Sequence, residues 1–155
     1  MTVENWLSLI SIILVAIGGF FAWHQWRVSN RIRRAEFINR IIETLRFDKG
    51  MAEMMYMIEY EKDWYTKNMD FHDNPSGIKF KADKLLSYFE YICYLKKTKN
   101  ITRKEFGVLQ YDIDAACLSS DVQDYLRFLS EVSTETKHPY PNLLAYGNCR
   151  RITKP

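Results

Sequence analysis

The sequence predicts an all-α protein: one N-terminal transmembrane helix followed by a cytosolic bundle of about five helices. Three observations lead to this fold class. They are an uncharged apolar run near the N-terminus, arginines directly after it, and helical spacing of apolar residues through the rest of the chain. The expected organisation is an extracytoplasmic N-terminus at residues 1–5, a transmembrane helix at 6–26, a juxtamembrane helix at 27–46 and a cytosolic helical domain at 47–155.

The predicted membrane helix rests on residues 6–23, which contain no charged side chain. Because a helix rises about 1.5 Å per residue, a run of this length approaches the roughly 30 Å of a bilayer's hydrocarbon core. Trp6 at one end, and Trp23 and Trp26 at the other, are placed as interfacial anchors, and Arg27 follows them. A secretory signal peptide would need a basic start, whereas this chain begins Met-Thr-Val-Glu-Asn. A buried core helix of this length would be unusual in so small a domain.

The charges that flank the run predict its orientation. Glu4 is the only charged side chain before it, whereas Arg27, Arg31, Arg33 and Arg34 follow it closely. The positive-inside rule therefore places the N-terminus outside and the C-terminal domain in the cytoplasm. The chain has three widely spaced cysteines, and an odd number cannot pair completely, which indicates reduced thiols.

Small residues recur along one side of the predicted membrane helix. They are Ser11, Val15, Gly18 and Ala22, at spacings of four, three and four. Such a small-xxx-small pattern permits close helix approach and predicts a contact face for a homo-oligomer. Patterns of this kind also arise by chance, so self-association and a lone anchor both stay open.

The helix that follows the arginines either runs on from the membrane helix or bends near Ser29-Asn30, and Asp48-Lys49-Gly50 breaks it. Further apolar rows predict a second, third, fourth and fifth helix. Capping boxes at Thr102–Glu105 and Ser120–Gln123 predict the starts of the last two. The apolar positions of the five helices are Ile38, Ile41, Ile42 and Leu45; Met51, Met54, Met55 and Ile58; Leu85, Leu86, Phe89 and Ile92; Phe106, Leu109, Ile113 and Ala116; and Val122, Tyr125, Leu126 and Leu129.

The methionines of the second helix, at positions 51, 54, 55 and 57, have two interpretations. The favoured one is an adaptable core face, and the other is a surface that repacks when a partner binds.

Motifs for catalysis are scarce. The histidines are His24, His72 and His138, and none stands in a metal-binding or general-base motif. Neither a Gly-rich phosphate loop nor a nucleophile elbow occurs. The sequence therefore predicts a protein that is not an enzyme, with no catalytic residue, metal or cofactor.

Basic groups favour a binding role. All 22 basic residues lie at or after Arg27, against 18 acidic residues there, an excess of four that is far from a dedicated DNA binder. We expect an anionic ligand at His138, Asn142, Arg150 and Arg151, which supply hydrogen-bond donors within a short irregular stretch. The alternative is that these basic groups are solvated helix ends and a loose tail.

Two sequence features carry a resemblance to known proteins. One is the membrane helix followed by Arg31-Ile-Arg-Arg34 and Phe37-Ile38-x-x-Ile41-Ile42. The other is the succession Leu85-Leu86-x-x-Phe89-Glu90-Tyr91-Ile92, Ile101-Thr102-x-x-x-Phe106, Tyr125-Leu126 and Tyr140-Pro141-Asn142-Leu143. This layout resembles a broad group of small bacterial helical proteins that are often membrane-anchored.

The architecture is also similar to the small single-pass membrane effectors of type III CRISPR antiviral defence, whose cytosolic domain senses cyclic oligoadenylate. The resemblance implies a bacterial inner-membrane location, a cyclic oligonucleotide ligand, homo-oligomerisation and an action on the lipid bilayer. The rival hypothesis is a membrane-tethered protein–protein interaction module without a nucleotide ligand.

Overall fold

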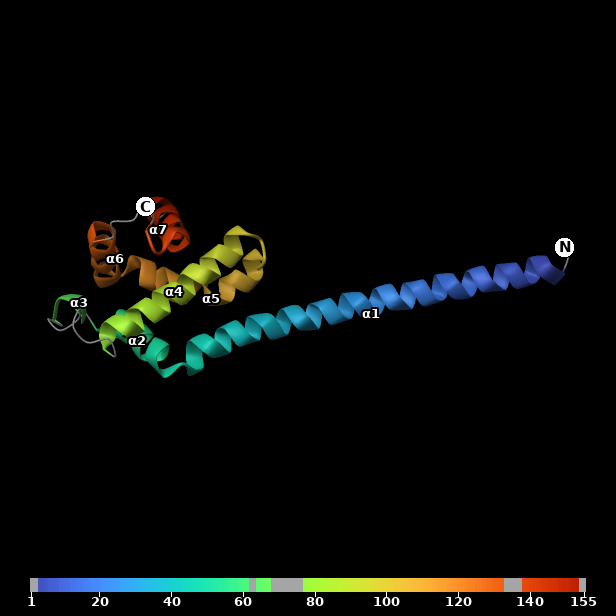
Figure 1. The fold of residues 1–155 in the computed structure, drawn as a ribbon, viewed down its shortest axis with the longest axis horizontal. Helices are drawn as coiled ribbons and strands as arrows, with labels where there is room; N and C mark the ends of the chain where they lie inside the picture. The colour runs from blue at the N-terminus through green and yellow to red at the C-terminus, as the bar shows by residue number, and fades with distance from the viewer. Residues whose placement is uncertain (1–2, 62–63, 68–76, 133–137, 154–155) are drawn as a thin grey trace. The chain divides into compact units, whose positions relative to one another are not determined.

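The computed structural model describes residues 3–61, 64–67, 77–132 and 138–153, and every regular element among them is an α-helix (Figure 1). Within the helices, the side chains at positions 3–5, 7, 9, 66–67 and 149–153 lie outside the description. The prediction of an all-α fold is confirmed. The elements are α1 (Val3–Phe47), α2 (Lys49–Tyr60), α3 (Trp64–Lys67), α4 (Ile78–Lys97), α5 (Arg103–Leu118), α6 (Ser120–Val132) and α7 (Pro141–Thr153).

The chain divides into two compact units, residues 1–41 and 42–155. Helix α1 is continuous across the boundary and ends at Phe47, so the predicted membrane and juxtamembrane segments form one helix without a break at Ser29-Asn30. In α1, the side chains are described without interruption only from Ile10 onward. Among the described residues, no helix is both long enough and apolar enough to cross a membrane.

In the first unit, large apolar side chains are exposed on every side of α1. The four consecutive positions 12–15 point in directions about 100° apart, and each is between 48% and 73% exposed. A helix that packs against a soluble core has instead one apolar stripe and one polar face. The exposed apolar residues are Trp6, Ile10, Ile12, Ile13, Leu14, Val15, Ile17, Phe20, Phe21, Trp23 and Trp26.

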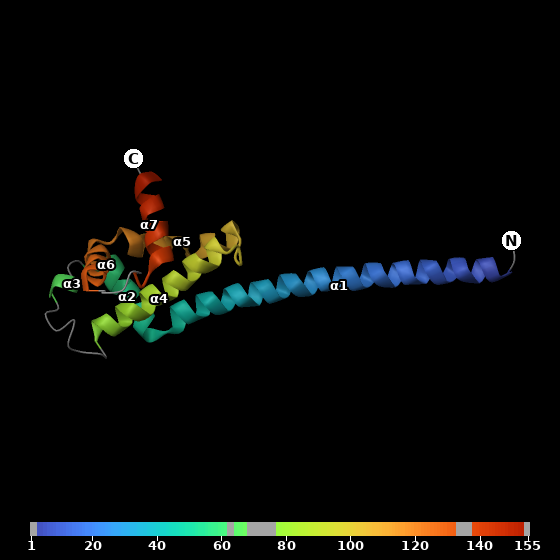
Figure 2. The same cartoon turned by 45° about the horizontal axis from the view of Figure 1, so that its top comes forward.

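In the second unit, α4 lies at the centre and contacts α2, α5 and α7 (Figure 2). The predicted apolar rows form the core, since Leu85, Phe89 and Ile92 of α4 have no exposed surface. From the other helices, the core includes Phe106, Leu109, Ile113 and Ala116 of α5, and Val122, Tyr125 and Leu126 of α6.

The methionine row of α2 belongs to the core at two of its positions. Met51 and Met54 are 3% and 0% exposed, which confirms the core interpretation there. The start of α2 is held by Asp48, whose Oδ1 accepts the Met51 N–H at 3.1 Å and whose Oδ2 lies 2.5 Å from Lys84 Nζ of α4.

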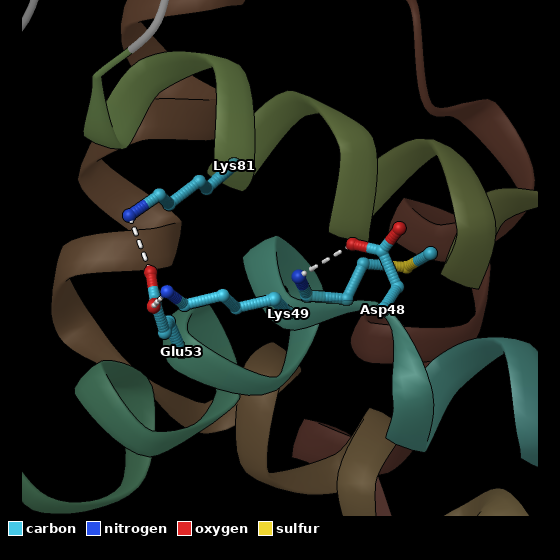
Figure 3. A network of polar contacts seen from close by, with 5 residues as sticks. Asp48, Lys49, Glu53 and Lys81 are labelled. Atoms are coloured by element: carbon cyan, nitrogen blue, oxygen red, sulfur yellow. Dashed lines mark hydrogen bonds and ion pairs between the residues drawn. The ribbon is translucent and has the colours of Figure 1, made fainter.

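A second ion pair joins the same two helices. Glu53 of α2 accepts Lys81 Nζ of α4 at 2.5 Å and lies 3.9 Å from Lys49 Nζ (Figure 3). These lysines lower the pKa values of Asp48 and Glu53. Since these groups are exposed, the pairs orient α2 on α4 more than they stabilise it.

The two predicted capping boxes differ in outcome. At α5, the Thr102 hydroxyl accepts the Glu105 N–H at 3.3 Å and the Glu105 carboxylate accepts the Thr102 N–H at 2.6 Å, as predicted. At α6, the helix begins at Ser120 as expected. The Gln123 amide, however, donates to the Cys117 carbonyl at 3.0 Å instead of reaching back to Ser120, because α5 ends close by.

The stretch expected to be irregular around Asn142 is helical instead. Pro141 occupies the first position of α7, where its missing N–H is no loss. Glu90 of α4 caps the new helix, because its carboxylate accepts the N–H groups of Asn142 at 2.9 Å and Leu143 at 2.7 Å. The sequence prediction was wrong because this cap comes from a residue far away in the chain.

Replacement of Glu90 by alanine should destabilise the second unit by about 1–3 kcal/mol, because two helix N–H groups lose their acceptor. Glu90→Gln keeps one oxygen acceptor and should lose less. The measurement is urea unfolding of the full chain followed by circular dichroism, with the exposed Glu131→Ala as control. Equal stability of Glu90→Ala and the parent would contradict the capping role.

Candidate functional site

Helices α5, α6 and α7 enclose a half-open cleft of about 220 Å³, here named the α5–α6–α7 cleft (the helices are labelled in Figure 2). Its walls are Cys117 from α5; Gln123, Leu126, Arg127 and Ser130 from α6; His138 before α7; and Leu143, Leu144, Gly147 and Asn148 from α7.

The floor of the cleft is apolar. Cys117, Leu126 and Leu143 are each at most 7% exposed. Helix α7 passes close to α5 at Gly147, where a Cβ atom would lie 3.5 Å from Cys117 Sγ. The absence of a side chain at Gly147 therefore keeps this end of the cleft open.

His138 lines the cleft, and both of its ring nitrogens have backbone partners. The Tyr140 N–H donates to Nδ1 at 3.0 Å, and Nε2 lies 3.0 Å from the Leu126 carbonyl oxygen. Because Nδ1 accepts a hydrogen bond, the neutral ring carries its proton on Nε2 and donates it to that carbonyl. The imidazole thus ties the segment before α7 to α6 and presents its ring, not a spare nitrogen, to the cleft.

Arg127 provides positive charge at the mouth of the cleft. Its guanidinium lies 3.2 Å from Asp124 Oδ1, in a pair whose side chains are 69% and 45% exposed. A surface pair of this kind is weak and readily exchanges one partner for another anion. The neighbouring Ser130 hydroxyl is already used, since it donates to the Arg127 carbonyl at 2.6 Å.

The predicted ligand residues are not all brought together. Asn142 lies on the α4 side of α7, where its amide donates to Glu90 at 2.5 Å and accepts Lys97 Nζ at 3.1 Å. The side chains of Arg150 and Arg151 lie outside the described residues. Their positions in α7 come three and four residues after Gly147 and continue the helix beyond the cleft.

Sequence reasoning missed Gln123 and Arg127. The capping box at residue 120 predicted the helix that carries them, but a local pattern contains no information on which of its faces lies against α7.

The predicted membrane residues lie on α1. Ser11, Val15, Gly18 and Ala22 occupy one side of the helix, since their spacing matches its turn. A Cβ atom added at Gly18 would meet open space, so no other part of the described chain covers this position. At the predicted membrane–water interface, the Arg27 guanidinium lies 4.7 Å from the centre of the Trp23 ring.

Two of the cysteines belong to the described core. Cys93 and Cys117 are both buried thiols. No group of three or more histidine, cysteine or acidic side chains converges in that part of the chain. Burial, with a smaller contribution from nearby Cys117, raises the pKa of Cys93 to about 12.

Comparisons of this chain with protein-family models, with curated proteins and with solved structures find no match.

Cys93 should be nearly inert to alkylation while the protein is folded. With a pKa of about 12 instead of 9, its thiolate fraction at pH 8 is about a thousandfold below that of an ordinary cysteine, and it grows only as the pH rises toward 12. Iodoacetamide labelling followed by peptide mass spectrometry measures this. Cys93 in urea should react at the ordinary rate, and equally fast labelling of the folded chain would refute the prediction.

Proposed function

We propose that this chain is a membrane-anchored sensor-effector, in which residues 6–26 cross a bilayer and the helical domain after them binds an anionic cytosolic second messenger. The observation that carries the proposal is the ring of exposed apolar side chains around α1, bounded by Trp6 at one end and by Trp23, Trp26 and Arg27 at the other. Each large apolar side chain gains about 1.5–3 kcal/mol when it leaves water. A helix that exposes so many of them is far more stable in hydrocarbon than in water.

The arginines after the apolar run support the proposed orientation. Arg27, Arg31, Arg33 and Arg34 would hold the C-terminal end of the span at the cytoplasmic leaflet of a bacterial inner membrane, where anionic headgroups attract them.

The α5–α6–α7 cleft is the proposed ligand site. Its apolar floor suits the flat face of a base, and Arg127 at its mouth suits a phosphate. The arginines at positions 150 and 151 follow the cleft along α7 and would add positive charge. His138 would shape the site without donating a hydrogen bond to the ligand, because both ring nitrogens are bonded to the backbone. Asn142 would act indirectly by holding the start of α7.

The volume of the cleft bears on how a cyclic oligoadenylate would bind. About 220 Å³ is below the roughly 300–1,000 Å³ of pockets that enclose a whole drug-sized ligand. One cleft would therefore hold one nucleotide unit, and a cyclic ligand would bridge several copies of the chain. The small-residue side of α1, at Ser11, Val15, Gly18 and Ala22, would let their membrane helices meet. The ligand would act on the membrane only if it bound one arrangement more tightly than another.

The membrane proposal predicts that the full chain, expressed in a bacterium, stays in the membrane fraction after alkaline carbonate extraction. Ile13→Arg with Ile17→Arg should release it, because each arginine near the bilayer centre costs about 2.5–3.5 kcal/mol. The matched control is Val108→Arg, an exposed apolar residue of the second unit, which should leave the chain in the membrane. Extraction of the parent chain by carbonate would overturn the proposal.

The ligand proposal predicts binding of cyclic tetra- or hexaadenylate to the detergent-solubilised full chain, measured by titration calorimetry. Arg127→Ala should weaken binding by about tenfold or more, the cost of one charge-assisted hydrogen bond. Arg103→Ala removes an equally exposed arginine at the start of α5 and should change little. Absence of heat at tens of micromolar would exclude these ligands.

A membrane-tethered interaction module is the second candidate function. Burial of Met54 argues against the methionine row as its surface, since Met54→Asp would place a charge in the core. Exposed aromatic side chains in α2 and α5 favour this candidate instead, because tyrosines are enriched at protein interfaces.

A further inference from the structure

Three of the exposed tyrosines of the second unit lie on α2 and α5. Tyr56 and Tyr60 of α2 are 59% and 66% exposed, and Tyr111 of α5 is 67% exposed. The rings of Tyr56 and Tyr60 have centroids 4.9 Å apart, so they form one aromatic surface. Together with Glu59, these tyrosines are named here the tyrosine cluster.

Glu59 joins the two helices of the cluster. Its Oε1 accepts the Tyr111 hydroxyl at 2.6 Å. This hydrogen bond is the largest cause that raises the pKa of Tyr111, with smaller contributions from burial, Tyr60 and Asp112. The hydrogen bond ties Tyr111 of α5 to α2, although the Tyr111 side chain is open to solvent.

The carboxylate of Glu59 still has capacity to bind. It is exposed and forms no ion pair with any residue that the structure describes. Burial is the largest cause that raises the pKa of the nearby carboxyl Asp112, with a smaller contribution from Glu59, whereas the positive charge of Arg46 lowers that pKa. The surface therefore combines aromatic faces with negative charge.

Other tyrosines of the same domain have a different role, which sets the cluster apart. Tyr125 and Tyr140 are buried, and both hydroxyls donate to Asp83 Oδ1, at 2.5 Å and 3.2 Å. Those side chains build the core, whereas the cluster contributes little to it. Rigid tyrosines that are exposed and held by a hydrogen bond are typical of surfaces that bind a partner.

We propose that the tyrosine cluster binds an arginine side chain from a basic segment of a partner protein. A guanidinium stacks on tyrosine faces and offers two parallel N–H groups to a carboxylate, which the Tyr56–Tyr60 surface and Glu59 supply side by side. Charge complementarity selects this partner, because the exposed Glu59 carboxylate attracts a guanidinium and would repel an anionic ligand. The site is separate from the α5–α6–α7 cleft and does not depend on the proposed nucleotide.

The test uses the full chain in a non-ionic detergent and a fluorescein-labelled hexa-arginine peptide, with binding measured by fluorescence anisotropy. Tyr56→Leu with Tyr60→Leu keeps the charge and most of the apolar surface but removes the aromatic faces. This double variant should weaken binding by about five- to thirtyfold, the loss of two cation–π contacts. The matched control is Tyr91→Leu with Tyr94→Leu, two tyrosines on α4 that are 46% and 48% exposed, and it should bind as the parent does.

A second variant tests the carboxylate. Glu59→Gln keeps the shape and an acceptor for the Tyr111 hydroxyl, and it should weaken hexa-arginine binding several-fold. Hexa-lysine should bind the parent less tightly than hexa-arginine, since an ammonium has no plane to stack. Circular dichroism of each variant checks that the helices are intact. The proposal is overturned if hexa-arginine does not bind the parent, or if the cluster variant and the α4 control have equal affinity.

Discussion

The arrangement of the second unit depends on the carboxylate of Glu90. Helix α7 begins with N–H groups that no residue within the helix can satisfy. Glu90 reaches from the central helix α4 and accepts the N–H groups of Asn142 and Leu143, and it also accepts the Asn142 amide. Because α7 supplies one wall of the α5–α6–α7 cleft, this cap helps to hold the candidate ligand site in shape.

A second carboxylate of α4 holds α6 and the segment before α7 in place. Asp83 accepts the hydroxyl of Tyr125 from α6 and that of Tyr140 just before α7. Burial is the largest cause that raises the pKa of both phenols, that of Tyr140 to about 12, so both stay protonated donors at neutral pH. His138 also connects these segments, through its hydrogen bonds to α6 and to the Tyr140 backbone. Two acidic residues on one helix thus fix the segments around the cleft.

Local patterns predicted most of the helices, and long-range contacts account for what was missed. The Thr102–Glu105 box and the apolar row around Phe89 depend on neighbours within two turns, so the sequence displays them directly. The cap of α7 lies 52 residues away in Glu90, and without it the Pro141-Asn142 stretch has the composition of a loop. Arg127 was missed for the same reason. Its place at the cleft follows from how α6 packs and not from its neighbours in the sequence.

The α5–α6–α7 cleft and the tyrosine cluster would select partners of opposite charge. In the α5–α6–α7 cleft, the described polar groups of His138 and Ser130 are engaged with the backbone, which leaves Arg127 as the charge that a ligand meets. In the tyrosine cluster, Glu59 is the charge that a partner meets. If the two proposals hold, Glu59 would disfavour a nucleotide at the cluster and Arg127 would disfavour a basic segment at the cleft. Helix α5 contributes to both surfaces, through Cys117 and Tyr111. A displacement of α5 on binding at one surface would therefore change the binding affinity of the other. By thermodynamic linkage, binding at the second surface would change the affinity of the first by the same factor.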